Sequence, residues 1–244
     1  MRPRGDCLGA IEYFTKRGGD GQMEKAEKII LFQGDSITDG GRLKGRQNEW
    51  DLNHQMGHGY AFLINAAMGC RYPEKNLCFF NRGVSGNRIA DLYGRWTEDT
   101  LCLKPDILSV LVGINDCGST LHDGAGSPPA RFEKIFQLML DEVREANPAV
   151  KIVLCEPFAL PVGPLQDDFD AWRELLEPLQ EKVRCVAEKN RAVFVPLQER
   201  FQELLSVREA KYWVWDGVHP TVCGHQVIAQ QWMDCTGCSA GAFL

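Results

Sequence analysis

Five short apolar runs, separated by longer segments of helical periodicity, constrain the fold more than any other feature of this sequence. Each run is rich in β-branched or aromatic residues and lacks the alternation of a half-exposed strand, which is the pattern of strands covered on both faces. The runs are residues 28–33, 77–81, 106–113, 151–157 and 192–197. We therefore predict five buried strands.

The intervals between these runs predict helices. Apolar residues recur there at the three- and four-residue spacing of a helix with one buried face, in residues 59–70, 89–103, 128–147, 167–190 and 221–233. Strands that alternate with helices favour a parallel sheet, because a parallel connection needs a crossover segment. The predicted fold class is α/β: a single doubly wound, mostly parallel five-stranded sheet with helices on both faces, in the flavodoxin-like strand order 2-1-3-4-5.

The length and composition are those of one domain. With 244 residues, of which 44% are hydrophobic and 25% charged, the chain can bury one sizeable core. We expect residues 25–244 to form this domain. The glycine-rich, charged residues 1–24 are expected to be a flexible extension or a cloning remnant.

Charge and hydropathy argue against several classes of partner. A formal net charge of -6 provides no basic surface for a phosphate backbone, so no nucleic-acid partner is expected. No apolar run approaches the roughly 18 residues of a membrane span, and the first residues lack the apolar core of a secretory signal, so no membrane partner is expected. Several of the ten cysteines lie inside apolar runs, which favours reduced thiols and a cytoplasmic location.

Small polar motifs stand at the ends of the first three predicted strands. They are GDS at 34–36, NRGVSGN at 81–87 and GIND at 113–116. In an open α/β sheet, ligands bind beyond the carboxyl ends of the strands where the strand order reverses. The order 2-1-3 therefore places Ser36 between Gly86 and Asn115, which puts a hydroxyl nucleophile beside a backbone N–H and a side-chain amide.

A serine hydroxyl is a poor nucleophile near neutral pH unless a base removes its proton, so Ser36 needs a histidine. The segment WDGVHPT, just before the last predicted helix, supplies His219, with Asp216 three residues earlier. This spacing lets the carboxylate hold one imidazole nitrogen while the other faces the serine. We expect the polar, irregular residues 40–57 to form a loop beside this site.

Four segments in order, GDSIT, GVSGN, GIND and DGVHP, resemble the four sequence blocks of the SGNH, or GDSL-type, hydrolases. Their order and spacing match along residues 28–232. The resemblance implies the flavodoxin-like SGNH hydrolase fold, with Ser36 as nucleophile, His219 as general base and Asp216 as its orienting partner. It also implies an oxyanion hole made by the N–H groups of Ser36 and Gly86 and the amide of Asn115, and ester hydrolysis through an acyl-enzyme with no metal or organic cofactor.

Longer stretches resemble the bacterial acetylxylan esterases of the SGNH type. They are GDSITD followed by Gly-Arg, NRGVSGNRIADL with RWTED, KPDILSVLVGIND, and WDGVHPTVCGH. This resemblance implies an esterase that removes acetyl or another short acyl group from a carbohydrate such as a xylo-oligosaccharide. It further implies a cytoplasmic enzyme acting on imported oligosaccharides, and a homo-oligomer. The chain departs from the pattern at Cys117 and Gly118, where those esterases tend to carry bulkier residues, so the acyl preference stays open.

Two other functions stay open from the sequence. A lysophospholipase or thioesterase of the same superfamily would use the same catalytic residues, although the chain shows no long apolar lid. A non-catalytic carbohydrate-binding relative would keep the fold, although all the expected catalytic side chains are present. Asp35 and Trp215 are the candidates for substrate contact. For Asp35 the alternative is a structural hydrogen-bonding role, and for Trp215 it is buried packing.

Each candidate catalytic residue also has a structural interpretation. Ser36 would cap the helix that follows its strand, and Gly86 would serve a turn that needs a positive φ angle. Asn115 would satisfy loop backbone. Asp216 and His219 would form a surface pair beside a turn. The four blocks taken together favour the catalytic interpretation.

Three further motifs are expected to carry no chemistry. His54 and His58, four residues apart, would share one face of a helix as metal ligands, but the glycines around them favour a polar loop. Cys235 and Cys238 form an isolated CxxC. Ser239 lies in GCSAG, which matches a nucleophile elbow, but no acid or histidine follows it. We therefore expect no metal site.

Overall fold

The computed structural model describes residues 28–44 and 53–238. The predicted extension at 1–24, the middle of the predicted 40–57 loop, and Ser239 lie outside the described residues. The described chain contains one parallel five-stranded sheet in the order β2-β1-β3-β4-β5, so the predicted fold class and strand order are confirmed. Its strands are β1 (Lys28–Gly34), β2 (Leu77–Asn81), β3 (Ile107–Leu111), β4 (Lys151–Cys155) and β5 (Val193–Val195).

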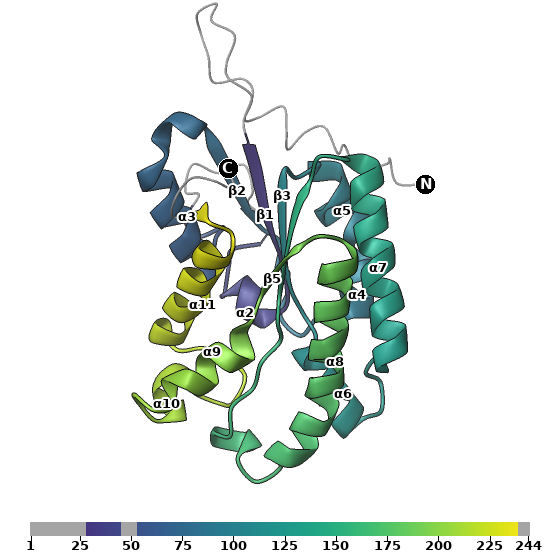
Figure 1. The fold of residues 1–244 in the computed structure, drawn as a ribbon, viewed down its shortest axis with the longest axis vertical. Coiled ribbons are helices and arrows are strands. Elements are labelled where there is room, and N and C mark those ends of the chain that lie inside the picture. Colours follow the sequence, from purple (N-terminus) through teal and green to yellow (C-terminus); the bar gives the residue numbers. More distant parts are fainter. Residues whose placement is uncertain (1–27, 45–52, 239–244) are drawn as a thin grey trace, which may run out of the picture.

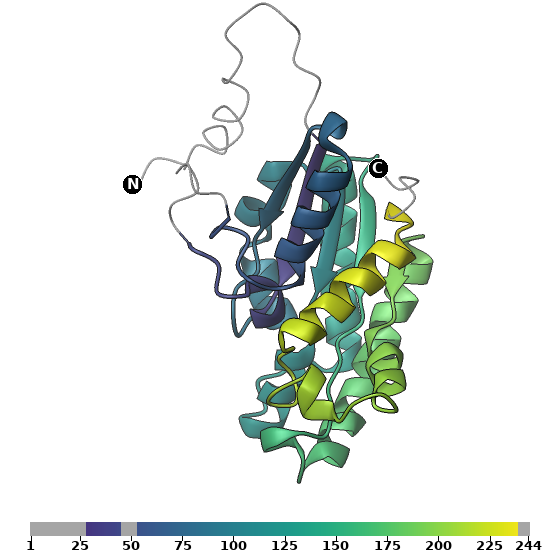
Figure 2. The ribbon, with the colours of Figure 1, turned by 90° about the vertical axis from the view of Figure 1, so that its left-hand side faces the viewer.

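Helices cover both faces of the sheet (Figure 1 and Figure 2). On one face α3 (Tyr60–Arg71) packs against α11 (Val222–Cys235), and on the other α7 (Pro129–Ala146) packs against α8 (Phe169–Lys189) and α4 (Ile89–Gly94). The shorter elements are α2 (Ser36–Asp39), α5 (Trp96–Asp99), α6 (Ile114–His122), α9 (Leu197–Leu204), α10 (Ala210–Trp213) and the 3₁₀ turns η1 (Pro73–Lys75), η2 (Leu101–Leu103) and η3 (Gly163–Leu165). No helix in the described part combines the length and apolar character needed to cross a bilayer.

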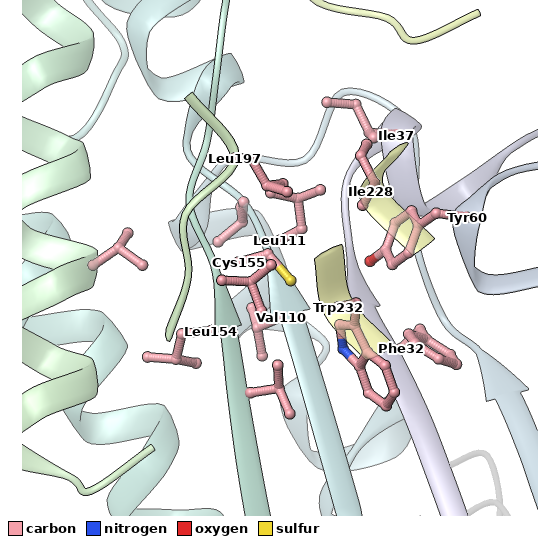
Figure 3. Packing of buried hydrophobic residues seen from close by; sticks show 14 of the residues in the cluster. Phe32, Ile37, Tyr60, Val110, Leu111, Leu154, Cys155, Leu197, Ile228 and Trp232 are labelled. Carbon is pink, nitrogen blue, oxygen red and sulfur yellow. The ribbon is translucent and has the colours of Figure 1, made fainter. Parts of the chain in front are cut away.

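The core between sheet and helices joins the first strand to the last helix. Phe32 of β1 is fully buried and meets Tyr60 of α3 edge to face and Trp232 of α11 at a tilt, with ring centroids 5.8 Å apart in both pairs (Figure 3). The Trp232 indole N–H donates to Ser109 Oγ of β3 at 3.0 Å. Burying an aromatic side chain of this kind contributes about 1.5–3 kcal/mol. This packing fixes α11 on β1, the strand that leads into Ser36.

Two stretches differ from the sequence-based prediction. Residues 89–103 form α4, α5 and η2 in place of one helix, because Arg95 leaves the helical conformation, with φ −118° and ψ 12°, and turns its side chain toward the strand ends. The GIND segment does not remain a loop but begins α6, directly after Gly113. Periodicity did not show this helix because its first turn carries the polar pair Asn115 and Asp116.

Candidate active site

The structure brings Ser36, His219 and Asp216 together at the carboxyl edge of the sheet. Ser36 Oγ lies 2.8 Å from His219 Nε2, although 183 residues separate them in the chain. His219 Nδ1 lies 2.6 Å from Asp216 Oδ2. Ser36 is the first residue of α2, where β1 ends, and the other two stand in the segment between α10 and α11. A hydroxyl, an imidazole and a carboxylate in this chain of contacts can move a proton from the serine to the histidine.

Asp216 holds both the imidazole ring and the loop that carries it. Its Oδ1 accepts the backbone N–H groups of Val218 at 3.1 Å and His219 at 2.7 Å. Burial pushes the pKa of Asp216 upward, but the hydrogen bonds from His219 and Val218 outweigh it and hold the pKa below its usual value. The carboxylate therefore stays ionised, and it can stabilise a positive charge on the ring.

The cap of α2 is Asp35, not Ser36. Asp35 Oδ1 accepts the Ile37 N–H at 3.0 Å, so the interpretation of Ser36 as a helix cap is wrong. Gly34, the last residue of β1, has no room for a side chain, because a Cβ there would lie 2.2 Å from the Leu111 carbonyl oxygen. The Gly-Asp-Ser sequence thus permits a tight turn from strand to helix and leaves the serine hydroxyl for the histidine.

The two candidates for substrate contact have different outcomes. The structure contradicts substrate contact by Asp35, because only 1% of its surface is exposed and its Oδ2 is buried without a partner in the described residues. Burial raises the pKa of Asp35 to about 7. Trp215 is 60% exposed and stacks on the His219 ring, with centroids 5.5 Å apart and planes at 18°. The buried-packing alternative for Trp215 is therefore wrong, and its contact with substrate stays a prediction.

Gly86 and Asn115 lie side by side around one turn. Gly86 has a φ of 82° in the turn that the Asn87 N–H closes on the Val84 carbonyl at 3.1 Å, and a Cβ at Gly86 would meet nothing within 4 Å. Asn115 Nδ2 donates to the Asn87 carbonyl at 3.1 Å. The structural interpretations of Gly86 and Asn115 thus hold. The side-chain nitrogen of Asn115 still has a second N–H, which can donate to another group. The N–H groups of Ser36 and Gly86 donate to no other residue in the described chain.

Side chains that the sequence analysis did not assign hold this turn in place. Asp39 Oδ2 accepts the N–H of Ser85 at 3.0 Å and its hydroxyl at 2.9 Å. Asp116 is fully buried, and its Oδ2 accepts the Ile89 N–H at 2.9 Å. Asp39 and Asp116 stand in the stretches GDSITD and GIND, so their place in those motifs was the available signal. Which backbone groups they bind was not visible from the sequence.

The structure shows what occupies the space beside Cys117 and Gly118. A Cβ on Gly118 would lie 3.1 Å from the indole of Trp172, which comes from α8. Cys117 is buried, which raises the pKa of its thiol to about 12, and it borders a cavity of about 270 Å³ between α6, α7 and α8. A side chain at position 118 would therefore press against the Trp172 ring.

The remaining motifs lie apart from these contacts. His54 and His58 stand among turns and bends, so the shared helix face that would make them a metal pair is not formed. In the described chain, no group of three or more His, Cys, Asp or Glu side chains is arranged to hold a metal ion. Cys235 and Cys238, like every other cysteine in the described residues, are free thiols.

The chain matches a known protein family and resembles solved enzymes over most of its length. The model of the GDSL-like lipase/acylhydrolase family matches residues 32–227. An acetylxylan esterase from Geobacillus stearothermophilus is 33% identical over 213 residues, which cover 84% of this chain and 91% of that enzyme. The crystal structure of Axe2, an acetylxylan esterase from Geobacillus stearothermophilus, superposes with a TM-score of 0.73 at 30% identity over 86% of this chain and 94% of the other. Two more structures are catalytic mutants of it, with a serine and an aspartate replaced by alanine. A GDSL-like lipase structure from Parabacteroides merdae superposes with a TM-score of 0.80 at 37% identity, over 86% of this chain and 95% of the other.

Proposed function

Since the chain belongs to the family of GDSL-like lipases and acylhydrolases, we propose that this ester hydrolase removes short acyl groups, acetyl above all, from carbohydrates such as xylo-oligosaccharides. The observation that carries the proposal is the contact between Ser36 Oγ and His219 Nε2 at 2.8 Å, continued by the contact of His219 with Asp216 at 2.6 Å. A nucleophile, its base and an orienting carboxylate are what acyl transfer through an acyl-enzyme requires.

The reaction runs in two steps. His219 Nε2 takes the proton of Ser36 as Oγ attacks the ester carbonyl carbon. The bond between this carbon and the sugar oxygen then breaks, and the ring gives its proton to that oxygen, so the sugar leaves as an alcohol. The acyl group is now bonded to Ser36. In the second step His219 takes a proton from water, the hydroxide attacks the acyl carbon, and Ser36 leaves with the proton returned. Such general-base assistance contributes about 10²–10⁴-fold to the rate.

The carbonyl oxygen becomes negative in both steps, and three donors are available for it. They are the N–H groups of Ser36 and Gly86 and the second N–H of the Asn115 amide. Donors held in place before the reaction stabilise the developing charge without reorganising, and each is worth about 2.7–4 kcal/mol in the barrier. In this proposal the chain's own residues supply all the chemistry, with no metal or organic cofactor.

Two observations support a sugar ester over other esters. Trp215 is stacked on the proposed base and is 60% exposed, so it offers an aromatic surface beside the leaving group, and pyranose rings pack on such surfaces. The relative with 33% identity is an acetylxylan esterase. We accordingly expect Trp215→Ala to raise KM for acetylated xylo-oligosaccharides more than for aryl acetates, which present no sugar.

The test is hydrolysis of aryl acetates and acetylated xylo-oligosaccharides by the wild type and by Ser36→Ala. We expect Ser36→Ala to abolish turnover of both substrates and the exposed-serine control Ser206→Ala to leave it unchanged. Free thiols such as the exposed Cys70 can cleave activated esters slowly, so all three proteins are alkylated before the assay. Turnover that persists in alkylated Ser36→Ala would overturn the proposed mechanism.

A series of acyl chain lengths tests the substrate separately. The proposal predicts rates that fall from acetyl to octanoyl, and rates that rise along this series would favour a lysophospholipase or thioesterase. Binding of acetylated sugars without turnover would indicate a carbohydrate-binding relative. The proposal also includes a cytoplasmic location and a homo-oligomer, which cell fractionation and light scattering of the purified chain would test.

A further inference from the structure

We propose that Arg95 is a positioning residue of the active site, one whose guanidinium ties the end of the nucleophile strand to the turn that carries Gly86. Arg95 lies between α4 and α5, and its side chain is 18% exposed. The inference rests on the function proposed above, because it assigns a task to the oxyanion donors.

The guanidinium reaches both parts of the site at once. Its Nη2 donates to the Gly34 carbonyl at 3.2 Å, two residues before Ser36. Its Nη1 donates to the Arg82 carbonyl at 2.7 Å, and its Nε donates to Asn87 Oδ1 at 2.7 Å. One planar group therefore links the last residue of β1 to both sides of the turn that contains Gly86.

Asn87 is held from two sides. Arg95 binds its side-chain oxygen, and Asn115 binds its backbone carbonyl at 3.1 Å. Two of the three proposed oxyanion donors, the Gly86 N–H and the Asn115 amide, therefore depend on where Asn87 lies. Releasing Asn87 from Arg95 would let the turn move relative to Ser36, and displacements of about 1 Å cost up to 10²-fold in rate.

The surroundings of Arg95 explain why an arginine is needed. Its Nη1 also contacts Gln33 Oε1 at 3.0 Å and Asp99 Oδ2 at 2.9 Å, so five acceptors surround one side chain. Burial lowers the pKa of Arg95, but a guanidinium keeps its proton in proteins. The five N–H groups of arginine lie in a fixed plane that matches acceptors in several directions, whereas the ammonium of lysine is a single point donor.

The test separates positioning from mere stabilisation of the fold. We compare Arg95→Ala and Arg95→Lys with Arg144→Ala, a control that removes another arginine bonded to a backbone carbonyl, that of Asn190 at the end of α8. We expect both Arg95 variants to lose at least about tenfold in kcat with KM changed less than about twofold. Arg144→Ala should melt at a lower temperature and keep its kcat. Added guanidinium ion at low concentration should restore part of the kcat of Arg95→Ala and none in the control.

A second variant covers the case in which Arg95→Ala does not fold. Asn87→Ala removes one end of the link and leaves the buried charge in place, so it should lower kcat in the same way. An Asn87→Ala variant with wild-type kcat would overturn the proposal, as would a folded Arg95→Ala whose kcat is unchanged or whose loss appears only in KM.

Labelling of Ser36 by a fluorophosphonate distinguishes this proposal from the proposed function, because it needs no knowledge of the natural ester. During labelling, negative charge develops on the phosphonate oxygen at the place where the carbonyl oxygen of an ester would lie. The labelling rate therefore depends on the same oxyanion donors. Failure of wild-type Ser36 to react would refute the proposed function. If the fluorophosphonate labels Ser36 no faster in the wild type than in Arg95→Ala, the positioning role alone is refuted.

Discussion

Asp35→Asn tests whether the residue beside the nucleophile carries a proton in the folded protein. Asp35 Oδ1 accepts the Ile37 N–H at 3.0 Å, and the carbonyl oxygen of asparagine can keep this bond. Oδ2 is buried without a partner in the described chain. Asparagine is neutral at every pH, so the substitution removes the titration and changes the shape of the side chain little. It leaves a constant cost for the buried NH₂ group, about 1–3 kcal/mol.

The magnitude follows from the pKa of the buried carboxyl. Burial raises the pKa of Asp35 from 3.8 to about 7, against opposing effects of the Ile37 N–H and His219, while Asp116 raises it further. Between these two values the unfolded chain has released the proton and the folded chain has not. The stability that the neutral carboxyl provides is thus complete below pH 4 and is lost as the pH rises to 7. Over this range each pH unit lowers the free energy of unfolding by about 1.4 kcal/mol, so about 4 kcal/mol is lost between pH 3.8 and pH 7.

The assay is urea unfolding of both proteins at intervals from pH 4.5 to 8.5, followed by circular dichroism. The stability of wild type minus that of Asp35→Asn should fall as the pH rises and level off above 7. His225 acts in the opposite direction, because burial lowers its pKa to about 4, but it is present in both proteins and cancels in the difference. A difference that changes by less than about 1 kcal/mol across the range would refute the reasoning, since this is the error of such extrapolations.

Three other substitutions have expected outcomes. Asp216→Asn should lower kcat by up to about 10⁴-fold in steady-state kinetics, because the amide cannot hold the imidazole in the same tautomer. Thr221→Ala should lower the free energy of unfolding by about 1 kcal/mol, because the Thr221 hydroxyl caps α11 by accepting the Gly224 N–H; an unchanged urea midpoint would contradict this. Gly83→Ala should cost about 1–3 kcal/mol and lower kcat, because its Cβ would lie 2.3 Å from the Asp39 nitrogen. Its control is Gly94→Ala, where a Cβ meets nothing within 4 Å and stability should not fall.

Much of the fold could be predicted because it depends on local patterns. The bounds of the strand at 77–81 were predicted to the residue from its apolar run, but the prediction that it is buried was wrong for its first four residues, which are only half-buried because β2 lies at the edge of the sheet. The prediction for 89–103 was wrong because periodicity describes only which face of a helix is buried. Periodicity does not show that five hydrogen-bond acceptors near the ends of β1 and β2 and in α5 surround the Arg95 side chain, or that the helix is interrupted at this residue.

The active site also has features that the sequence could predict and features that it could not. Ser36, Gly86 and Asn115 could be predicted to meet, because they follow three neighbouring strands whose ends share one edge of the sheet. Substrate contact by Asp35 could not be tested from the sequence, because the sequence does not show whether a carboxylate beside a nucleophile is buried or exposed. Its 1% exposure follows from the turn between β1 and α2.

The sequence by itself determined the five strand segments, the residue types at the strand ends and the pairing of Asp216 with His219, because each depends on local pattern or short spacing. The family resemblance predicted that His219 serves Ser36, but only the tertiary structure gave this contact its geometry, because the two residues are 183 positions apart and meet where α11 packs against β1. The tertiary structure also decided that Trp172 fills the space beside Gly118 and that Arg95 links two strand ends. Such contacts join segments far apart in the chain, and their geometry comes from packing that no local pattern encodes.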